Sequence, residues 1–125
     1  TATSADYADL AEKYVTDEKY STGTVVCIGG DKEATASTSG CMPIGVISDK
    51  PAYLMNAKGL GQTIGLKGRV PVRVVDPVTK GDIVYVGVNN GTASKLADDG
   101  ANIIGVALET NAETGEKLVE CVLKV

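Results

Sequence analysis

Residues that could carry out chemistry are few in this chain, because it contains no histidine. Ser-His-Asp and Cys-His arrangements, and metal sites built on imidazole, are therefore excluded. The sixteen Asp and Glu residues leave a glycosidase-type carboxylate pair open. Most of them, however, lie in predicted turns or in the N-terminal segment, where solvated turns and caps account for them. We therefore expect no catalytic residues and no enzymatic activity.

The three cysteines, Cys27, Cys41 and Cys121, are an odd number and show no C-x-x-C spacing. Cys27 and Cys121 lie within apolar strand patterns, so we interpret both as small buried hydrophobic side chains. Cys41 lies in a loop rich in Ser, Thr and Gly. A disulfide between Cys27 and Cys41 is the alternative. Without histidine we cannot assemble a zinc site around these residues, so no bound metal is predicted.

Two further segments match functional motifs only in part. Gly59, Gly61 and Gly65 are one residue off the dinucleotide-binding spacing, and they lack the preceding strand and the following helix. Thr1 could act as an N-terminal nucleophile only within a larger framework that positions it. We therefore predict no cofactor.

The charge pattern argues against nucleic-acid and membrane partners. The net charge is −4, and Arg69 and Arg73 are the only arginines. A nucleic-acid surface is usually basic and interleaved with stacking aromatic residues. No apolar run approaches the length of a membrane span. The 125 residues suit one domain. Because the chain does not begin with Met, we expect a fragment of a longer protein, with a processed product as the alternative.

One short β pattern occurs twice. A polar turn followed by an apolar run occupies residues 21–30 and returns at residues 79–88. Each copy is followed by an Ile-Gly-Val strand, at residues 44–46 and 104–106. We predict an all-β fold, a small barrel or sandwich, whose single domain (21–125) contains two similar units at about 21–75 and 79–125. The matched Gly45 and Gly105 indicate bulges or close backbone crossings.

Residues 1–20 form a different N-terminal arm. Tyr7, Leu10, Ala11 and Tyr14 recur at helical spacing, so a short helix over residues 5–14 is predicted, with an extended arm as the alternative. The segment Tyr53-Leu54-Met55 places three large apolar residues in an irregular loop. Such a loop requires an apolar surface to cover it, either the core or a partner subunit.

Residues 62–67 and 69–75 read as two strands around Gly68. Because Pro71 cannot donate a ladder hydrogen bond, we expect an edge, or a free side at that residue.

The motifs D-L-A-E-x-Y, Y-x-x-G-T-V-V, G-V-x-S-x-x-P-A-Y-L-M-N and G-R-V-P follow one another over the first 75 residues, and K-G-D-x-V and I-G-x-A-L-E follow them. In these motifs the sequence resembles a domain of tail fibres and related virion proteins of tailed bacteriophages. The resemblance implies a non-enzymatic structural role in the virion and a homotrimer. It also implies contacts with other virion proteins and with a host surface receptor. The trimer contact would use Tyr7, Leu10, Tyr14, Tyr53, Leu54 and Met55.

Two other functions remain as alternatives. The repeated strand design also resembles small capsid decoration proteins, which stabilise the phage head. A self-cleaving processing domain of a tailspike is the third hypothesis.

Overall fold

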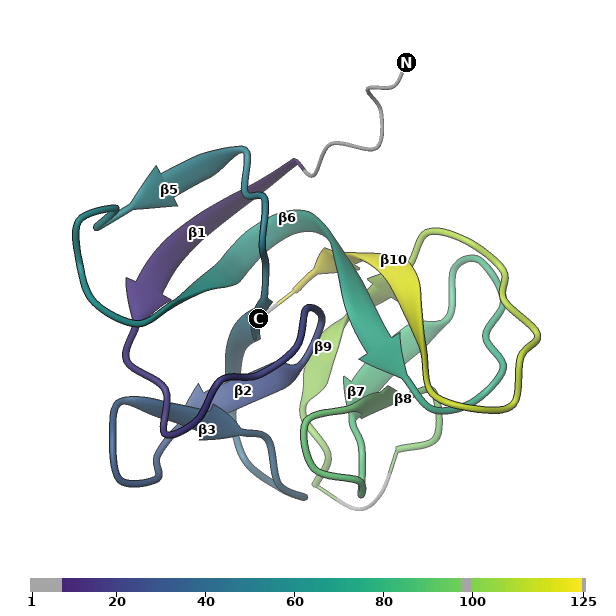
Figure 1. The fold of residues 1–125 in the computed structure, drawn as a ribbon. Helices are drawn as coiled ribbons and strands as arrows, with labels where there is room; N and C mark the ends of the chain where they lie inside the picture. Colours follow the sequence, from purple (N-terminus) through teal and green to yellow (C-terminus); the bar gives the residue numbers. More distant parts are fainter. Residues whose placement is uncertain (1–7, 98–99, 125) are drawn as a thin grey trace.

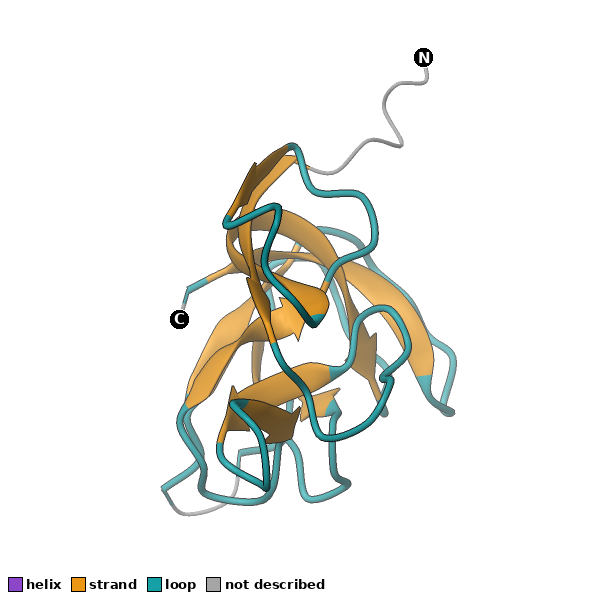
Figure 2. Ribbon diagram, turned by 60° about the vertical axis from the view of Figure 1, so that its left-hand side comes forward, coloured by secondary structure: helices purple, strands orange, loops and turns teal. Residues whose placement is uncertain are grey.

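The computed structural model describes residues 8–97 and 100–124. In this part of the chain it contains ten strands and no helix, and hence no helix that could span a membrane (Figure 1, Figure 2). The predicted all-β class is confirmed. The strands are β1 (Ala8–Tyr14), β2 (Val25–Ile28), β3 (Ala34–Ala36), β4 (Pro43–Ile47), β5 (Tyr53–Met55), β6 (Gln62–Val74), β7 (Ile83–Val86), β8 (Ala93–Ser94), β9 (Ile103–Ala107) and β10 (Lys117–Leu123).

Five strands close into a small mixed barrel, on the right of Figure 1. Going around it, β6 pairs with β10, β10 with β9, β9 with β7, β7 with β8, and β8 with β6. The β6–β8 pair is parallel, through Val74 and Ala93. The barrel encloses the larger apolar cluster, which is dominated by valine. Small aliphatic side chains fill the interior because the chain has no Phe and no Trp.

The other strands extend from the N-terminal half of β6, which pairs with β1 and with β4. β4 continues to β2 and β3, and β1 continues to β5. A second, smaller cluster lies among these outer strands: Val26, Ala34, Ile47 and Ile64. The outer pair β2–β4 also contributes Val25 and Val46 to the barrel cluster. The architecture is thus one five-stranded barrel with outer strands.

The predicted N-terminal helix is wrong. Residues Ala8–Tyr14 form strand β1, which lies between β5 and β6 and pairs with both. The alternative of an extended arm is the one that the structure shows, and Tyr7 lies outside the described residues. Leu10, Ala11 and Tyr14 do not form one equally buried apolar face. Ala11 is fully buried, whereas Leu10 and Tyr14 are half-buried.

The two Ile-Gly-Val strands make matching pairs. β2 runs antiparallel to β4 with Val26 opposite Gly45, and β7 runs antiparallel to β9 with Val84 opposite Gly105. In both pairs the register shifts directly after that valine. Such a shift is a β-bulge, which bends and twists the strand. The bulges expected at these two glycines are therefore present.

At each of the two glycines a backbone carbonyl group of a neighbouring strand also lies very close. A Cβ atom on Gly45 would lie 2.0 Å from the carbonyl oxygen of Gly65, and one on Gly105 would lie 2.2 Å from that of Val122. A side chain larger than hydrogen therefore does not fit without backbone movement. The close crossings that the sequence predicted at Gly45 and Gly105 are confirmed.

Residues 62–74 form one long strand, where the sequence indicated two. β6 continues through Gly68, whose φ of 97° lies in the region that favours glycine. Pro71 lies opposite Glu120 of β10. Arg73, two residues on, donates its backbone N–H to the Gly23 carbonyl at 3.0 Å and not to β10. By alternation the nitrogen of Pro71 also faces away from β10, so the expected free side at this proline is confirmed.

Cys27 and Cys41 form a disulfide with their Cα atoms 6.5 Å apart. The interpretation of Cys27 as a free buried thiol is therefore wrong, and the alternative pairing is correct. Cys121 is free and fully buried in the barrel, as predicted.

Candidate functional site

The structure brings the two segments of the predicted contact surface together. β1 and β5 run parallel, with Leu10 opposite Tyr53, Ala11 opposite Leu54, and Glu12 opposite Met55. They lie side by side at the upper left of Figure 1. Since β5 pairs with β1 alone among the described strands, its other side is an open sheet edge. We call Leu10, Tyr53, Leu54 and Met55 the β1–β5 surface.

Exposure within this surface is uneven. Tyr53 is 65% exposed and Met55 36% exposed, whereas Leu10 and Leu54 are half-buried. Tyr14 differs from the rest, because it packs against the outer cluster and donates its hydroxyl to Glu12 Oε1 at 3.1 Å. Burial raises the pKa of Tyr14, and the Glu12 hydrogen bond adds to the rise. Tyr14 is therefore half-buried against the outer cluster, and its role in a subunit contact stays a prediction.

A buried carboxyl group lies beneath this surface. Asp9 is 3% exposed, and its Oδ1 accepts the Ala52 N–H at 3.3 Å. Asp9 Oδ2 and the Ser48 hydroxyl are both buried, and neither has a hydrogen-bond partner in the described part of the chain. Burial raises the pKa of Asp9, while the nearby Ser48 hydroxyl and the Ala52 N–H oppose the rise. The expectation that acids of the N-terminal segment are solvated is wrong for Asp9.

The sequence did not indicate a second apolar surface on the outside of the barrel. Ile83 and Ile103 are 43% and 45% exposed, and they lie opposite Val106 and Tyr85 in the β7–β9 pair. Val122 of β10 lies next to Val106 and extends the patch. The signal was present, because β7 is apolar at every position and not only at alternate ones. We call Ile83, Tyr85, Ile103, Val106 and Val122 the β7–β9 surface.

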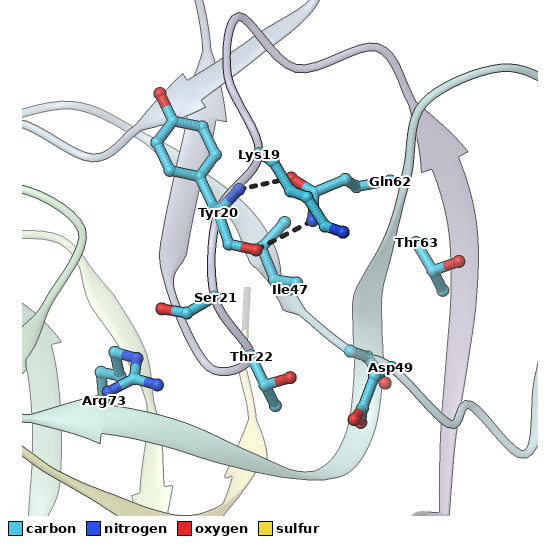
Figure 3. A pocket seen from close by; sticks show the side chains of 10 residues that line it. Lys19, Tyr20, Ser21, Thr22, Ile47, Asp49, Gln62, Thr63 and Arg73 are labelled. Atoms are coloured by element: carbon cyan, nitrogen blue, oxygen red, sulfur yellow. Dashed lines mark hydrogen bonds between the residues drawn. The ribbon is translucent and has the colours of Figure 1, made fainter.

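A groove with a mixed polar and apolar lining lies at the connection between β1 and β2. It consists of two cavities of about 520 and about 380 Å³, both lined by Lys19, Tyr20, Ser21 and Arg73. Figure 3 shows the larger cavity, with Ser21 and Thr22 between Arg73 and the start of β6 in this view. We call the two cavities together the Arg73 groove.

Gln62 fixes one wall of this groove. Its Oε1 accepts the Tyr20 N–H at 2.8 Å, and its Nε2 donates to the Tyr20 carbonyl at 2.9 Å (Figure 3). The same Oε1 also accepts the Thr16 hydroxyl at 3.1 Å. The Tyr20 hydroxyl donates to Asp17. That bond, together with one from Thr35, lowers the pKa of Asp17. The connection between β1 and β2 is therefore held in place by side-chain hydrogen bonds within the protein.

In residues 8–97 and 100–124 no three Cys, Asp or Glu side chains gather as a metal site would require. The one free thiol, Cys121, is inert, because burial, together with Glu109 and Glu120, raises its pKa to about 12. The surface features of the described residues are the apolar β1–β5 and β7–β9 surfaces and the Arg73 groove.

Comparison with known proteins identifies solved structures with a similar fold. No family model and no curated protein sequence matches the chain. A solved structure of pre-mature bacteriophage phi29 gene product 12 matches 94% of this chain, with a TM-score of 0.70 and 14% identity. This chain shares the fold of phage phi29 proteins. The matching region covers 22% of that protein's length.

Two further matches have almost the same length as this chain. The C-terminal fragment of phi29 gene product 12 is covered completely, with a TM-score of 0.68 and 14% identity over 93% of this chain. The N base of the phi29 head fibre protein gp8.5 is 92% covered, with a TM-score of 0.58 and 19% identity over 91% of this chain. The predicted resemblance to phage proteins is confirmed at the level of fold.

Proposed function

We propose that this chain is a structural domain of a phage virion, and more narrowly a tail-fibre domain that folds, trimerises and contributes to host attachment without catalysing a reaction. The observation that carries the proposal is the match to the N base of a phage head fibre over 91% of the chain, beside the match to a separate phage C-terminal fragment. A fold alone hosts many functions. The phage sequence motifs support this one independently.

Two surfaces support the trimer part of the proposal. The β1–β5 surface combines exposed apolar side chains with an unpaired strand edge. Such edges pair readily with another chain unless they are blocked. The β7–β9 surface is a continuous apolar face on the barrel wall, of the kind that marks protein–protein contacts.

The solution mass of the purified chain, from light scattering after size exclusion, tests this proposal. We expect the mass of three copies of the 12.8 kDa chain, maintained on dilution to micromolar concentration. A monomer at every concentration up to hundreds of micromolar would contradict the trimer. The same preparation also tests the self-cleaving alternative. A domain that had cleaved its own N-terminal part would have a chain mass below the mass encoded by its sequence.

A capsid decoration protein is the second candidate, because the head-fibre match fits a position on the phage head as well as one on the tail. A protein of this kind binds an assembled head and is stable as a free subunit. Co-sedimentation with purified phage heads distinguishes the two functions. Saturable binding to heads by a monomeric chain favours decoration, whereas a preformed trimer that does not bind heads favours the tail-fibre function.

A further inference from the structure

Strand β5 has few attachments to the rest of the protein. It is three residues long and, among the described strands, pairs with β1 alone (Figure 1). The side-chain hydrogen bonds next to its two ends are long. The Ala52 nitrogen lies 3.3 Å from Asp9 Oδ1, and Asn56 Nδ2 lies 3.5 Å from the Lys13 carbonyl oxygen. Segments with so few attachments open at a lower free energy than the core does.

One of these two bonds involves a buried carboxyl group. Asp9 is 3% exposed, and its Oδ2 has no hydrogen-bond partner among the described residues. The buried hydroxyl of Ser48 has none there either. Gly65 of β6 lies close to the same carboxyl oxygen, since a Cβ atom on Gly65 would be 2.8 Å from it. An ionised carboxylate is therefore poorly solvated at this position, whereas a protonated one gains a donor to offer to Ser48.

Charged neighbours do not account for the state of Asp9. Three elements contact it, and their charged side chains are Glu12 and Lys13 on β1, Lys67 and Arg69 on β6, and Asp49 and Lys50 in residues 48–52. None of the six contributes to the raised pKa of Asp9, which burial causes. The protonation of Asp9 is therefore controlled by its burial and by the opposing hydrogen bonds from Ser48 and Ala52.

We propose that Asp9 is a pH-dependent latch for strand β5. In acid the protonated carboxyl group is stable in its buried position and keeps residues 48–52 against β1. At higher pH the ionised carboxylate favours a state in which these residues and β5 separate from β1, so that water reaches Asp9. Strand β1 stays in place, because it pairs with β6 along its whole length from Ala8 to Tyr14.

Release of β5 changes the surface that the protein presents. It removes Tyr53, Leu54 and Met55 from the β1–β5 surface and leaves the outer edge of β1 without a strand partner. Because these three residues belong to the predicted subunit contact, the trimer should be more stable in acid. This consequence rests on the proposed function, whereas the latch itself does not.

Amide hydrogen exchange, followed by nitrogen-15 NMR from pH 3 to pH 8, measures the latch. Protection factors are compared, because they divide out the pH dependence of intrinsic exchange. Because the pKa of Asp9 is raised in the latched state, that state is fully favoured below pH 3.8 and is lost as the pH rises through the raised pKa. The protection factors of Ala52 and of the β5 amides should therefore fall by about tenfold, the effect of a buried charge that lacks a hydrogen-bond partner.

The reference amide is that of Val25, which is fully buried and donates to the Gly91 carbonyl at 2.9 Å. It should remain far better protected than β5 at every pH. The latch is overturned if the protection of β5 does not depend on pH. It is also overturned if β5 and Val25 have equal protection factors throughout, because Asp9 would then act on the whole fold and not on β5.

Three variants test whether Asp9 is the group responsible. Asp9→Asn should make the protection of β5 independent of pH, and an unchanged pH dependence in this variant contradicts the latch. Ser48→Ala removes a hydroxyl that lowers the pKa of Asp9, so the loss of protection should move to higher pH. Asp49→Asn removes an exposed carboxylate from the same segment and should behave as wild type. Should Asp9→Asn not fold, Ser48→Ala decides, and an unchanged midpoint in that variant contradicts the latch.

Light scattering at pH 5 and pH 8 separates the latch from the trimer proposal. The wild-type trimer should dissociate at a higher protein concentration at pH 8 than at pH 5, and Asp9→Asn should reduce this difference. A monomer at both pH values contradicts the trimer, while the exchange data still decide the latch. A trimer whose dissociation does not depend on pH, beside pH-dependent exchange in β5, supports the latch and excludes β5 from the subunit contact.

Discussion

Asp9 is an ionisable side chain in a buried position where one of its oxygens has no hydrogen-bond partner among the described residues. A carboxylate that is 3% exposed is unstable unless it is fully hydrogen-bonded, yet its Oδ2 has no partner in the described residues. Gly65 makes the position tighter, since a Cβ atom there would lie 2.8 Å from that oxygen. Asp9 therefore destabilises the junction of β1 with the Ser48–Ala52 segment whenever it is ionised.

We predict that Asp9→Asn stabilises the protein at neutral pH. The folded state holds the pKa of Asp9 above its ordinary value of 3.8, so the folded state favours the protonated form. Wild-type stability is therefore relatively highest below pH 3.8, and it falls as the pH rises through the raised pKa. Asparagine keeps the acceptor for Ala52 and adds a donor that can reach Ser48, without the charge.

Urea unfolding of both proteins from pH 3 to pH 8 measures this difference. The free-energy gap in favour of Asp9→Asn should be near zero at the acid end, grow with pH and then become constant. Asp82→Asn, in an exposed turn where the carboxylate accepts the Thr79 N–H at 2.8 Å, is the control and should not stabilise the protein. A gap that is constant at all pH values, or that favours wild type at pH 8, contradicts the assignment.

The disulfide and the buried Cys121 together predict how many thiols react in the native, the unfolded and the reduced protein. The native protein should not react with a thiol reagent at pH 8, because Cys121 is buried with a pKa of about 12 and the other two cysteines are paired. Unfolding should expose one thiol, and unfolding with reductant should expose three. The disulfide spans 14 residues, so reduction should lower the free energy of unfolding by about 3 kcal/mol. Three reactive thiols in unreduced, unfolded protein would rule out the Cys27–Cys41 bond.

At the scale of the element, strand β1 could not be predicted from its local sequence pattern. Its residues include Ala, Leu, Glu and Lys, all good helix formers, and its apolar spacing fits a helical stripe. The strand forms because β6 and β5 present backbone groups on both sides of it. Those partners are more than 35 residues away, so no local pattern could reveal them. Tertiary pairing therefore overrode local propensity.

The glycine positions were predictable because their cause is local. Gly45 and Gly105 interrupt matching apolar strands, and a glycine inside a strand indicates a bulge or a close approach. The disulfide was harder to predict from the sequence. Cys27 lies in an apolar strand pattern that describes a buried thiol equally well, and only the β2–β4 pairing brings Cys41 close to it. The groove could not be recognised in the sequence, because its lining comes from seven separate segments.

We predict that Gly45→Ala and Gly105→Ala each destabilise the fold by about 3 kcal/mol, since the backbone must move away from the new methyl group. Gly115→Ala is the matched control. No atom lies within 4 Å of its Cβ position, so this change should be neutral or stabilise by about 0.5 kcal/mol. Thermal unfolding of the three variants gives the comparison. Wild-type stability in Gly45→Ala would mean that β4 and β6 can separate freely.

For the whole molecule, the question is which apolar surface an assembly would cover. The barrel and the outer strands each leave one such surface uncovered, at β7–β9 and at β1–β5. The sequence motifs indicated the second. A symmetric trimer uses the same patches on every subunit, so a charge placed on the contact patch is introduced three times at once.

We predict that Leu10→Asp dissociates the trimer while changing the stability of the monomer by less than about 1 kcal/mol, because Leu10 is only half-buried within the chain. A leucine buried between subunits contributes about 2 kcal/mol per copy, so its loss from all three subunits should leave monomers at micromolar concentration. Ile28→Asp, at a position 61% exposed at the end of β2, is the control and should stay trimeric.

Light scattering of Leu10→Asp, Ile83→Asp and Ile28→Asp, each with its unfolding curve, separates the surfaces. Ile83 is 43% exposed on the barrel wall, so its replacement also leaves the monomer core intact. A trimeric Leu10→Asp beside a monomeric Ile83→Asp would move the contact to the β7–β9 surface and contradict the motif-based assignment. Because β5 would then keep a free edge in the assembled particle, that edge would remain available to a different virion protein.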